Sequence, residues 1–401
     1  MTTPQTTIWR KPEVLLIFMA AAMSISFSVW QALLNNFVVE RAAFSGAEIG
    51  ILQSLREVPG FLAFSVVFVL LAVREQTLAL LALGLTGLGV MLTGQFPTIW
   101  GLYVTTLIMS IGFHYYETLQ QSLTLQWIGK NDLPEAMGRQ ISARSFAALF
   151  AFVMVWLGME VLELDYAWLY LFAGGLTLAV ALWSWLMFPR FGQSTTQHKR
   201  IILRRRYWLY YALTFMGGAR RQIFIVFAAF MMVERFHFDA GEIALLFLVN
   251  HLLNIWLAPR VGRLISQWGE QRALTLEYLG LTLIFAAYAF VGSPWLAATL
   301  FVADHLLFAM AIAIRSYFQK IADPADIAAS SGVAFSINHI AAVVIPAAFG
   351  LLWLTSPAAV FLAGSVMALI SLMLARMIPD RPEPGRETIW QAATAGDSSR
   401  A

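Results

Sequence analysis

The 401-residue chain contains no cysteine. This absence excludes disulfide bonds, thiolate metal sites and a cysteine nucleophile, and it leaves the redox compartment undetermined. Charged residues are also scarce, because they make up 12% of the chain, whereas a soluble domain carries about 25%. Apolar residues reach 59%, which is more than a water-soluble fold can hide. The composition therefore favours a membrane protein.

Several catalytic motifs are missing as well. The chain has no His-Glu-x-x-His stretch, no Gly-x-x-x-x-Gly-Lys loop and no Gly-x-Ser-x-Gly turn, so neither a metalloprotease nor an ATP-driven pump is supported. The net charge of +3 does not indicate nucleic-acid binding, because the basic residues lie in short loops between apolar runs. We expect no enzyme activity, no cofactor, no metal and no nucleic-acid partner.

Long apolar runs are the main positive signal. Runs of roughly twenty residues can cross a hydrocarbon core of about 30 Å as helices. The pattern predicts an all-α membrane protein with twelve transmembrane helices in two pseudo-symmetric six-helix bundles. The predicted helices cover residues 12–39, 46–73, 77–96, 98–127, 136–162, 165–188, 207–233, 241–258, 273–291, 295–319, 327–354 and 357–377.

The polar segments divide the chain and orient it. Residues 1–188 and 207–378 are the predicted bundles, and residues 189–206, basic and without a carboxylate, are the predicted cytoplasmic linker. Residues 379–401 are rich in Pro, Gly, Ser and charge, which predicts a disordered cytoplasmic tail. Lys and Arg collect on alternate loops, so we expect a multi-pass protein of the bacterial inner membrane with both termini cytoplasmic.

An internal repeat supports the division into halves. Residues 39–52 and 233–246 share seven identities in fourteen positions, including Glu40 with Glu234 and Phe44 with Phe238. Both segments join the first and second helices of their half, so the halves have the same orientation. The alternative is that two helix-loop-helix connections acquired similar caps by convergence.

The chain resembles the major facilitator superfamily over nearly all its length: six plus six helices, a basic linker and cytoplasmic ends. The loop after the eighth predicted helix is similar to a loop motif of that family at Gly262, Leu264 and Gly269, and departs from it at Ser266 and Glu270. The resemblance implies alternating access, a gating role for Gly262 and Gly269, and a central cavity bordered by the first, fourth, seventh and tenth helices.

Polar side chains inside these helices are the candidate substrate site. Charges within a bilayer are kept mostly where they face a cavity or a partner. We expect Arg221, with Arg220 as a companion, to present positive charge to a carboxylate or phosphate, because a guanidinium forms paired hydrogen bonds. The remaining substrate candidates are Gln31, Tyr115, Tyr116, Asn250 and Arg56. The alternative is that the arginines pair with Glu117, Asp304 or Glu57 and lock helices together.

Acidic residues and histidines are the candidates for proton coupling. Ser110, His114, Glu117 and Gln121 recur at steps of four, three and four, which places them on one stripe of a helix. Glu117 is the first candidate, with His114 one turn away. Asp304 and His305 form a second acid–histidine pair. Structural salt bridges are the alternative for each of them.

Arg144 and Asn338 occupy equivalent places in the repeat. They are candidates for a pair of gate residues, and the alternative is that they hold helix ends together near the cytoplasm.

These patterns predict a secondary active transporter that moves a small solute, with an anion as one candidate, by alternating access. We expect ion coupling, with a proton favoured, a monomer, and a small-molecule substrate and the lipid bilayer as partners. A flippase for lipids or amphiphiles on the same scaffold is the first alternative, and a non-transporting membrane assembly protein is the second. A shared scaffold does not decide between them.

Overall fold

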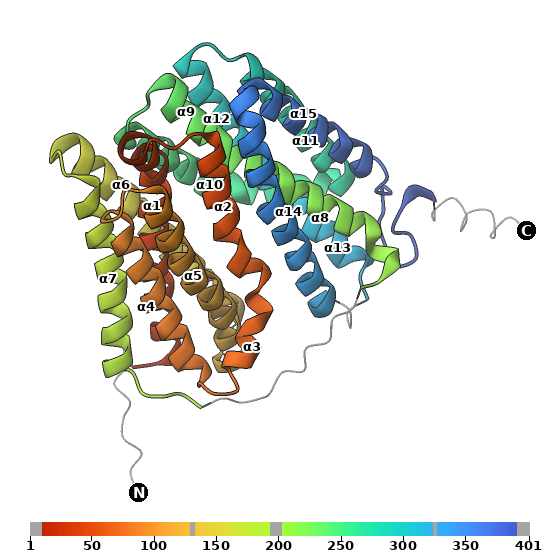
Figure 1. The fold of residues 1–401 in the computed structure, drawn as a ribbon. Helices are drawn as coiled ribbons and strands as arrows, with labels where there is room; N and C mark the ends of the chain where they lie inside the picture. The colour runs from red at the N-terminus through yellow and green to blue at the C-terminus, as the bar shows by residue number, and fades with distance from the viewer. Residues whose placement is uncertain (1–9, 129–132, 193–202, 324–326, 391–401) are drawn as a thin grey trace, which may run out of the picture. The chain divides into compact units, whose positions relative to one another are not determined.

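The computed structural model describes residues 10–128, 133–192, 203–323 and 327–390. Within those ranges the chain is built from helices and connections and has no β-strand. It forms two compact units, which are described separately (Figure 1). Most of the predicted linker, at residues 193–202, and the end of the predicted tail, at residues 391–401, lie outside the described residues.

Unit 1 comprises Met1–Phe44, Leu55–Gln197 and Phe238–Leu248. Its helices are α1 (Pro12–Ala42), the end of α2 (Gly46–Phe61), the short η1 (Ala63–Ser65) and α3 (Val66–Val69), α4 (Glu75–Thr93), α5 (Ile99–Trp127), α6 (Leu133–Trp156), the π-helical η2 (Leu157–Val161), α7 (Tyr166–Met187) and the start of α10 (Ala240–Trp268). Its hydrophobic core is formed by α1, α4 and α5, and includes Met19, Leu83 and Leu119.

Unit 2 comprises Ser45–Ser54, His198–His237 and Val249–Ala401. Its helices are the start of α2, η3 (Arg205–Tyr207), α8 (Trp208–Gln222), the π-helical η4 (Ile223–Ala228), α9 (Ala229–Phe236), the rest of α10, α11 (Glu270–Phe290), α12 (Pro294–Phe308), η5 (Ala309–Ala311), α13 (Ile312–Ile321), α14 (Ile327–Thr355) and α15 (Pro357–Ala375). Helices α11 and α15 pack side by side, and α8 packs against α14 (Figure 1).

The helix starts follow from the local sequence. The Thr98 hydroxyl accepts a hydrogen bond from the backbone N–H of Gly101 at 3.1 Å, and the Asp165 carboxylate accepts one from Ala167 at 2.9 Å. Such side chains satisfy backbone donors that have no partner inside the first turn of a helix. Helix α1 instead begins with Pro12 at its first position, where a missing N–H is harmless.

The internal repeat is visible in the backbone. Helix α1 ends at Ala43 with φ 50°, and α9 ends at His237 with φ 58°. A left-handed conformation is uncommon for residues other than glycine, and these two residues occupy matching positions of the repeat. The same irregular helix end in both halves supports duplication, because convergence of helix caps would favour glycine or asparagine there.

Two segments that overlap the repeat belong to a different compact unit from the one that the predicted halves imply. The predicted division places residues 45–54 in the first half and 238–248 in the second. In the structure, Ser45–Ser54 belongs to unit 2, where the hydroxyl of Ser54 accepts a hydrogen bond from the N–H of Ala347 in α14 at 2.9 Å. Phe238–Leu248 belongs to unit 1, where Phe247 stacks on Phe152 of α6 with ring centroids 5.5 Å apart.

Ten of the described helical segments are long and apolar enough to cross a membrane. The predicted spans at 46–73 and 98–127 do not meet this measure. The first is interrupted after Phe61, two residues beyond Pro59, and continues as the short η1 and α3. The second is the 29-residue α5, which is long enough but carries a polar stripe. The chain is therefore an all-helical, multi-pass membrane protein, and the count of twelve spans stays a prediction.

Residues 379–390, the start of the predicted disordered tail, pack against unit 2. The hydroxyl of Tyr317 donates a hydrogen bond to the backbone carbonyl of Glu387 at 2.6 Å, and the Ile389 N–H donates to the Met377 carbonyl at 2.9 Å. Glu387 and Thr388 are buried. Composition misses this contact because the tail is held by backbone groups, which residue type does not reveal.

Candidate functional site

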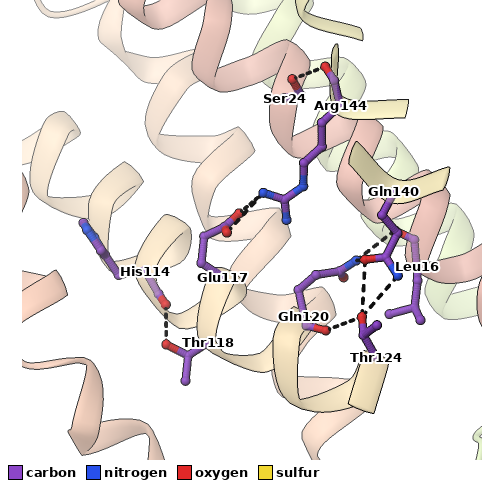
Figure 2. Close-up of polar contacts among 9 residues, drawn as sticks. All are labelled: Leu16, Ser24, His114, Glu117, Thr118, Gln120, Thr124, Gln140 and Arg144. Carbon is purple, nitrogen blue, oxygen red and sulfur yellow. Dashed lines mark hydrogen bonds and ion pairs between the residues drawn. The ribbon is translucent and has the colours of Figure 1, made fainter. Parts of the chain in front are cut away.

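Glu117 and Arg144 form an ion pair between α5 and α6 (Figure 2). The Arg144 Nη1 lies 2.9 Å from Oε1 and 3.1 Å from Oε2 of Glu117, and the Ser24 hydroxyl of α1 donates to the Arg144 carbonyl at 2.7 Å. Both side chains keep about a third of their surface exposed, at 34% and 33%. The sequence assigned them to different roles, coupling and gating, and the structure brings them together.

His114 and Glu117 both belong to the predicted stripe on α5. The His114 Nδ1 lies 3.0 Å from the carbonyl oxygen and 3.0 Å from the hydroxyl of Ser110, one turn earlier, and its ring points away from Glu117 (Figure 2). The stripe runs from the fully buried Ser110 to the exposed Gln121. Of the four side chains of the stripe, only Glu117 and Gln121 are exposed in part or in full.

Arg56, a predicted substrate residue, is buried in an ion pair with the adjacent Glu57. Its guanidinium lies 5.9 Å from the ring centroid of Trp30, and its carbonyl accepts a hydrogen bond from the hydroxyl of Ser110. The pairing with Glu57 is the one that the alternative named, but both residues belong to α2, so the ion pair itself does not join two helices.

A buried amide network that the sequence interpretation missed ties α5 to α1 and α6 (Figure 2). The Gln120 Nε2 donates to Gln140 Oε1 at 2.9 Å and to the Leu16 carbonyl at 3.0 Å, and the Gln140 Nε2 donates to the Thr124 hydroxyl at 3.2 Å. The available signal was the i, i+4 spacing of Gln120 and Thr124 in an apolar helix. The network therefore links α5 and α6, the helices that carry Glu117 and Arg144.

Arg221 and Asn338 meet in unit 2. The Arg221 Nη2 donates to the Asn338 Oδ1 at 2.9 Å, which joins α8 to α14. A Cβ on Gly218 would lie 2.6 Å from the Asn338 Nδ2, so the glycine admits the amide against the helix backbone. The sequence analysis assigned Arg221 to substrate and Asn338 to a gate.

Arg220 points into the interior of unit 2, beside two acidic residues. Its Nη1 lies 3.9 Å from the Glu277 Oε1 of α11, its Cζ lies 4.4 Å from the Tyr278 ring centroid, and its charge also acts on Asp304 of α12. All three charged side chains are buried, with 2%, 0% and 1% exposure for Arg220, Glu277 and Asp304. Glu277 was not among the predicted site residues, because its spacing matched no stripe.

The remaining substrate candidates are dispersed. Asn250 is fully buried, and neither atom of its amide has a hydrogen-bond partner among the described residues. Tyr116 belongs to the hydrophobic core of unit 1, while the Tyr115 hydroxyl lies 2.6 Å from that of Ser65. Gln31 is partly exposed on α1.

His305 lies near another histidine. Its ring centroid is 6.4 Å from that of His251 on α10 and 6.1 Å from that of Phe224. His305 is partly exposed, whereas the neighbouring Asp304 is buried. Successive residues of a helix point in directions about 100° apart, so the acid and the histidine face different surroundings.

The predicted loop after residue 258 is mostly helical, because α10 continues to Trp268. Gly262 therefore lies inside α10, which corrects its expected place in a loop. Gly269 forms the turn before α11 with φ 83° and ψ 161°, a conformation that is essentially restricted to glycine. Helix periodicity alone could not place this end, since polar residues also occur within helices.

Unit 1 also has a cavity of about 330 Å³ that contains none of the predicted site residues. Among the residues that line it are Arg74, Gln76, Trp127 and Arg190. The Gln76 side chain lines the cavity and binds the segment after α7: it donates a hydrogen bond to the Pro189 carbonyl at 3.0 Å and accepts one from the Phe191 N–H at 2.9 Å.

Spanning helices with charged groups inside them define a class: a multi-pass membrane protein with a polar interior, the architecture of a carrier. The family follows from the sequence comparison. The family model of the Major Facilitator Superfamily matches residues 14–346, and the chain belongs to this superfamily. Membership indicates a membrane transporter rather than an enzyme.

Solved structures share the fold at low sequence identity. The chain is similar to the nucleoside transporter NupG in a mutant form, with a TM-score of 0.76 and 14% identity over 91% of this chain and 99% of that one. It is also similar to a bacterial homologue of the human lysosomal transporter Spinster, in an inward-facing and unoccupied conformation, with a TM-score of 0.71 and 12% identity over 91% and 94%.

A third similar structure is a POT family transporter in complex with 5-aminolevulinic acid, with a TM-score of 0.69 and 12% identity over 90% of this chain and 94% of that one. No curated protein matches the sequence. At these identities the solved structures establish the fold alone.

Proposed function

We propose that this protein is a secondary active transporter that moves a small, anionic solute by alternating access, coupled to protons. The observation that carries the proposal is the Glu117–Arg144 pair in unit 1. These two charged side chains lie in helices of a membrane protein and are still about a third exposed. A charge facing lipid is costly, at about 2.5–3.5 kcal/mol on translocon scales. Their exposed surface therefore faces water or solute.

Arg221 supports the anionic substrate. Its Nη2 donates a hydrogen bond to the side-chain oxygen of Asn338, which orients the guanidinium. An oriented guanidinium is suited to bind a carboxylate or phosphate through two parallel hydrogen bonds.

The first experiment finds a ligand and then tests Arg221. Purified protein is heated with carboxylates, phosphates, sugars and amino acids, together with a nucleoside and 5-aminolevulinic acid, because a ligand that binds the folded state raises its apparent stability. Compounds that stabilise the protein are then tested for uptake into proteoliposomes. Arg221→Ala should abolish uptake of an anion, and Arg221→Lys should weaken its apparent affinity.

Arg139→Ala is the matched control, because Arg139 forms an exposed ion pair with Glu13 on the surface of unit 1. Exposed pairs contribute little to stability, about 0–1 kcal/mol. Uptake should be unchanged in this variant. Unchanged uptake and apparent affinity in Arg221→Ala would remove Arg221 from the substrate site.

Glu117 is the candidate coupling residue of this site, with Arg144 as its charge partner. Opening of the pair would remove the charge partner of Glu117, and uptake of a proton would then neutralise the unpaired carboxylate. Glu117→Gln should still exchange substrate across the membrane but no longer accumulate it against a gradient. Accumulation with a normal pH dependence would remove Glu117 from coupling.

The lipid flippase alternative predicts a different result in the same liposomes. Scrambling of a labelled phospholipid without solute uptake would refute the carrier proposal, and the reverse would refute the flippase. The proposal further places the protein in the bacterial inner membrane as a monomer with cytoplasmic termini. The orientation of the termini rests on the alternation of Lys and Arg between loops.

A further inference from the structure

The interior of unit 2 holds an incomplete charge balance at Arg220, Glu277 and Asp304. They come from three helices, α8, α11 and α12, and each is buried with 2% exposure or less. None of the four carboxylate oxygens has a hydrogen-bond partner among the described residues, and neither do Nε and Nη1 of Arg220. Buried polar groups in folded proteins are nearly always paired, so this cluster calls for an explanation.

The charges explain what is missing. A guanidinium stays protonated in proteins, so the fully ionised cluster carries one positive and two negative charges. The net charge of −1 lies in an interior where an uncompensated charge is strongly unfavourable. One added proton, on either carboxylate, makes the cluster neutral.

The surrounding groups do not supply a second positive charge. The charges acting on Glu277 come from Arg220 and Asp304, and the charge acting on Asp304 comes from Arg220. The facing phenols of Tyr278 and Tyr288 are neutral near neutral pH.

Within the part of unit 2 that the structure describes, the other helices packed on the cluster add no cation to it. His305 lies beside His251 instead, and the two imidazoles would repel each other if both were protonated. On α9, Arg235 is exposed and Glu234 accepts a hydrogen bond from Trp353. Helix α15, which packs on α8 and α11, has no titratable side chain. On α14 the titratable group is His339, whose Nδ1 lies 2.9 Å from the Phe335 carbonyl, and Arg315 of α13 is exposed.

We propose that Arg220, Glu277 and Asp304 form a proton-binding site that holds a single proton, carried by either Glu277 or Asp304. A metal cation does not fit the same place, because the guanidinium lies 3.9 Å from one of the carboxylate oxygens and would repel it. The proton comes from water and returns to water, and no covalent bond other than the carboxyl O–H forms or breaks.

The site deepens the proposed function, on which its role in transport rests. Loss of the proton leaves a net negative charge that the buried state does not accommodate. The deprotonated cluster therefore favours a conformation in which water reaches it, and reprotonation favours closure. This dependence gives unit 2 a means to couple proton release to a change of conformation.

Infrared spectroscopy of the purified protein tests the site without a substrate. A protonated carboxyl group has a carbonyl band that an ionised one lacks, so the wild-type protein near neutral pH should show one such band from a buried site. Glu277→Gln and Asp304→Asn should each abolish it completely, because either change leaves one carboxylate opposite one guanidinium. If the two acids were protonated independently, each of these variants would instead lose half of the band.

Arg220→Met provides the opposite perturbation. Without the guanidinium both carboxyls must be protonated, and the band should rise about twofold per protein. If this variant does not fold, the two single carboxylate variants still decide the question. Glu383→Gln is the control, since Glu383 is 55% exposed and forms a surface pair with Arg386, and it should leave the band unchanged.

Three results would overturn the single-proton site: no band in the wild type, a band that survives in both single variants, or a band that disappears in Glu117→Gln. The outcome is separate from that of the proposed function, because the band is read from protein at rest. A band with the expected pattern in a protein that transports no solute would refute the carrier proposal and leave the proton site standing.

Discussion

Two adjacent glycines in α7 allow a direct test of how unit 1 is packed. A Cβ at Gly174 would lie 2.3 Å from the Gly87 carbonyl oxygen and 2.3 Å from the Met91 N–H nitrogen in α4, whereas a Cβ at Gly175 meets nothing within 4 Å. The change examined is Gly174→Ala, with Gly175→Ala as its matched control. Small residues at such contacts let membrane helices approach closely.

The magnitude follows from the geometry. Real Cβ atoms essentially never lie within 3.0 Å of a heavy atom to which they are not covalently linked. The distance of 2.3 Å from a Cβ at Gly174 to α4 must therefore grow by 0.7 Å, which requires α4 and α7 to separate locally. Overpacking of this kind costs about 1–3 kcal/mol. Both variants gain the same helix propensity, up to about 1 kcal/mol. Their difference therefore isolates the packing cost.

The assay is unfolding in mixed micelles by a titration with dodecyl sulfate, followed by tryptophan fluorescence. Gly174→Ala should have a free energy of unfolding about 1–3 kcal/mol below that of Gly175→Ala. Free energies within about 0.5 kcal/mol of each other, the range of a neutral surface change, would refute the inferred contact between α4 and α7.

Three further predictions concern single contacts. Gly269→Ala should lower the free energy of unfolding by about 1–3 kcal/mol through strain at φ 83°, whereas Gly292→Ala, with open space and no positive φ, should not. Thr177→Val removes two buried hydrogen bonds between α1 and α7, each of 2.8 Å, and should cost about 1–2 kcal/mol in the same titration; an unchanged midpoint would contradict it. Truncation after residue 378 removes the Glu387 carbonyl that accepts from the buried Tyr317 hydroxyl, so the apparent melting temperature should fall, while truncation after residue 390 should leave it unchanged.

Contacts between helices give several candidate residues partners that the sequence did not indicate. Arg144 and Asn338, matched by the repeat, each bind a charged residue, Glu117 in unit 1 and Arg221 in unit 2. Arg220 and Arg221 are neighbours in the chain but diverge in α8: the first is buried beside Glu277, and the second meets Asn338. Adjacent arginines therefore belong to two sites with different chemistry.

The sequence by itself determined the class of protein and indicated an internal repeat. Apolar runs of spanning length have no other stable location than a bilayer, and backbone hydrogen bonds within each run require helices. The repeat was readable because seven of its fourteen residues are identical in the two segments, and the matching left-handed ends at Ala43 and His237 are consistent with it. Caps such as Asp165 also depend only on the local sequence, since they act within one turn.

Only the tertiary structure decided which charges meet. Helical periodicity places Glu117 on one face of α5, but it does not specify which helix covers that face, and therefore gave no reason to join it to Arg144 rather than His114. Glu277 fitted no stripe and gained its partner Arg220 only when α8 packed near α11. The same holds for the segments Ser45–Ser54 and Phe238–Leu248, because a contact between helices depends on their rotation and spacing, which no single helix encodes.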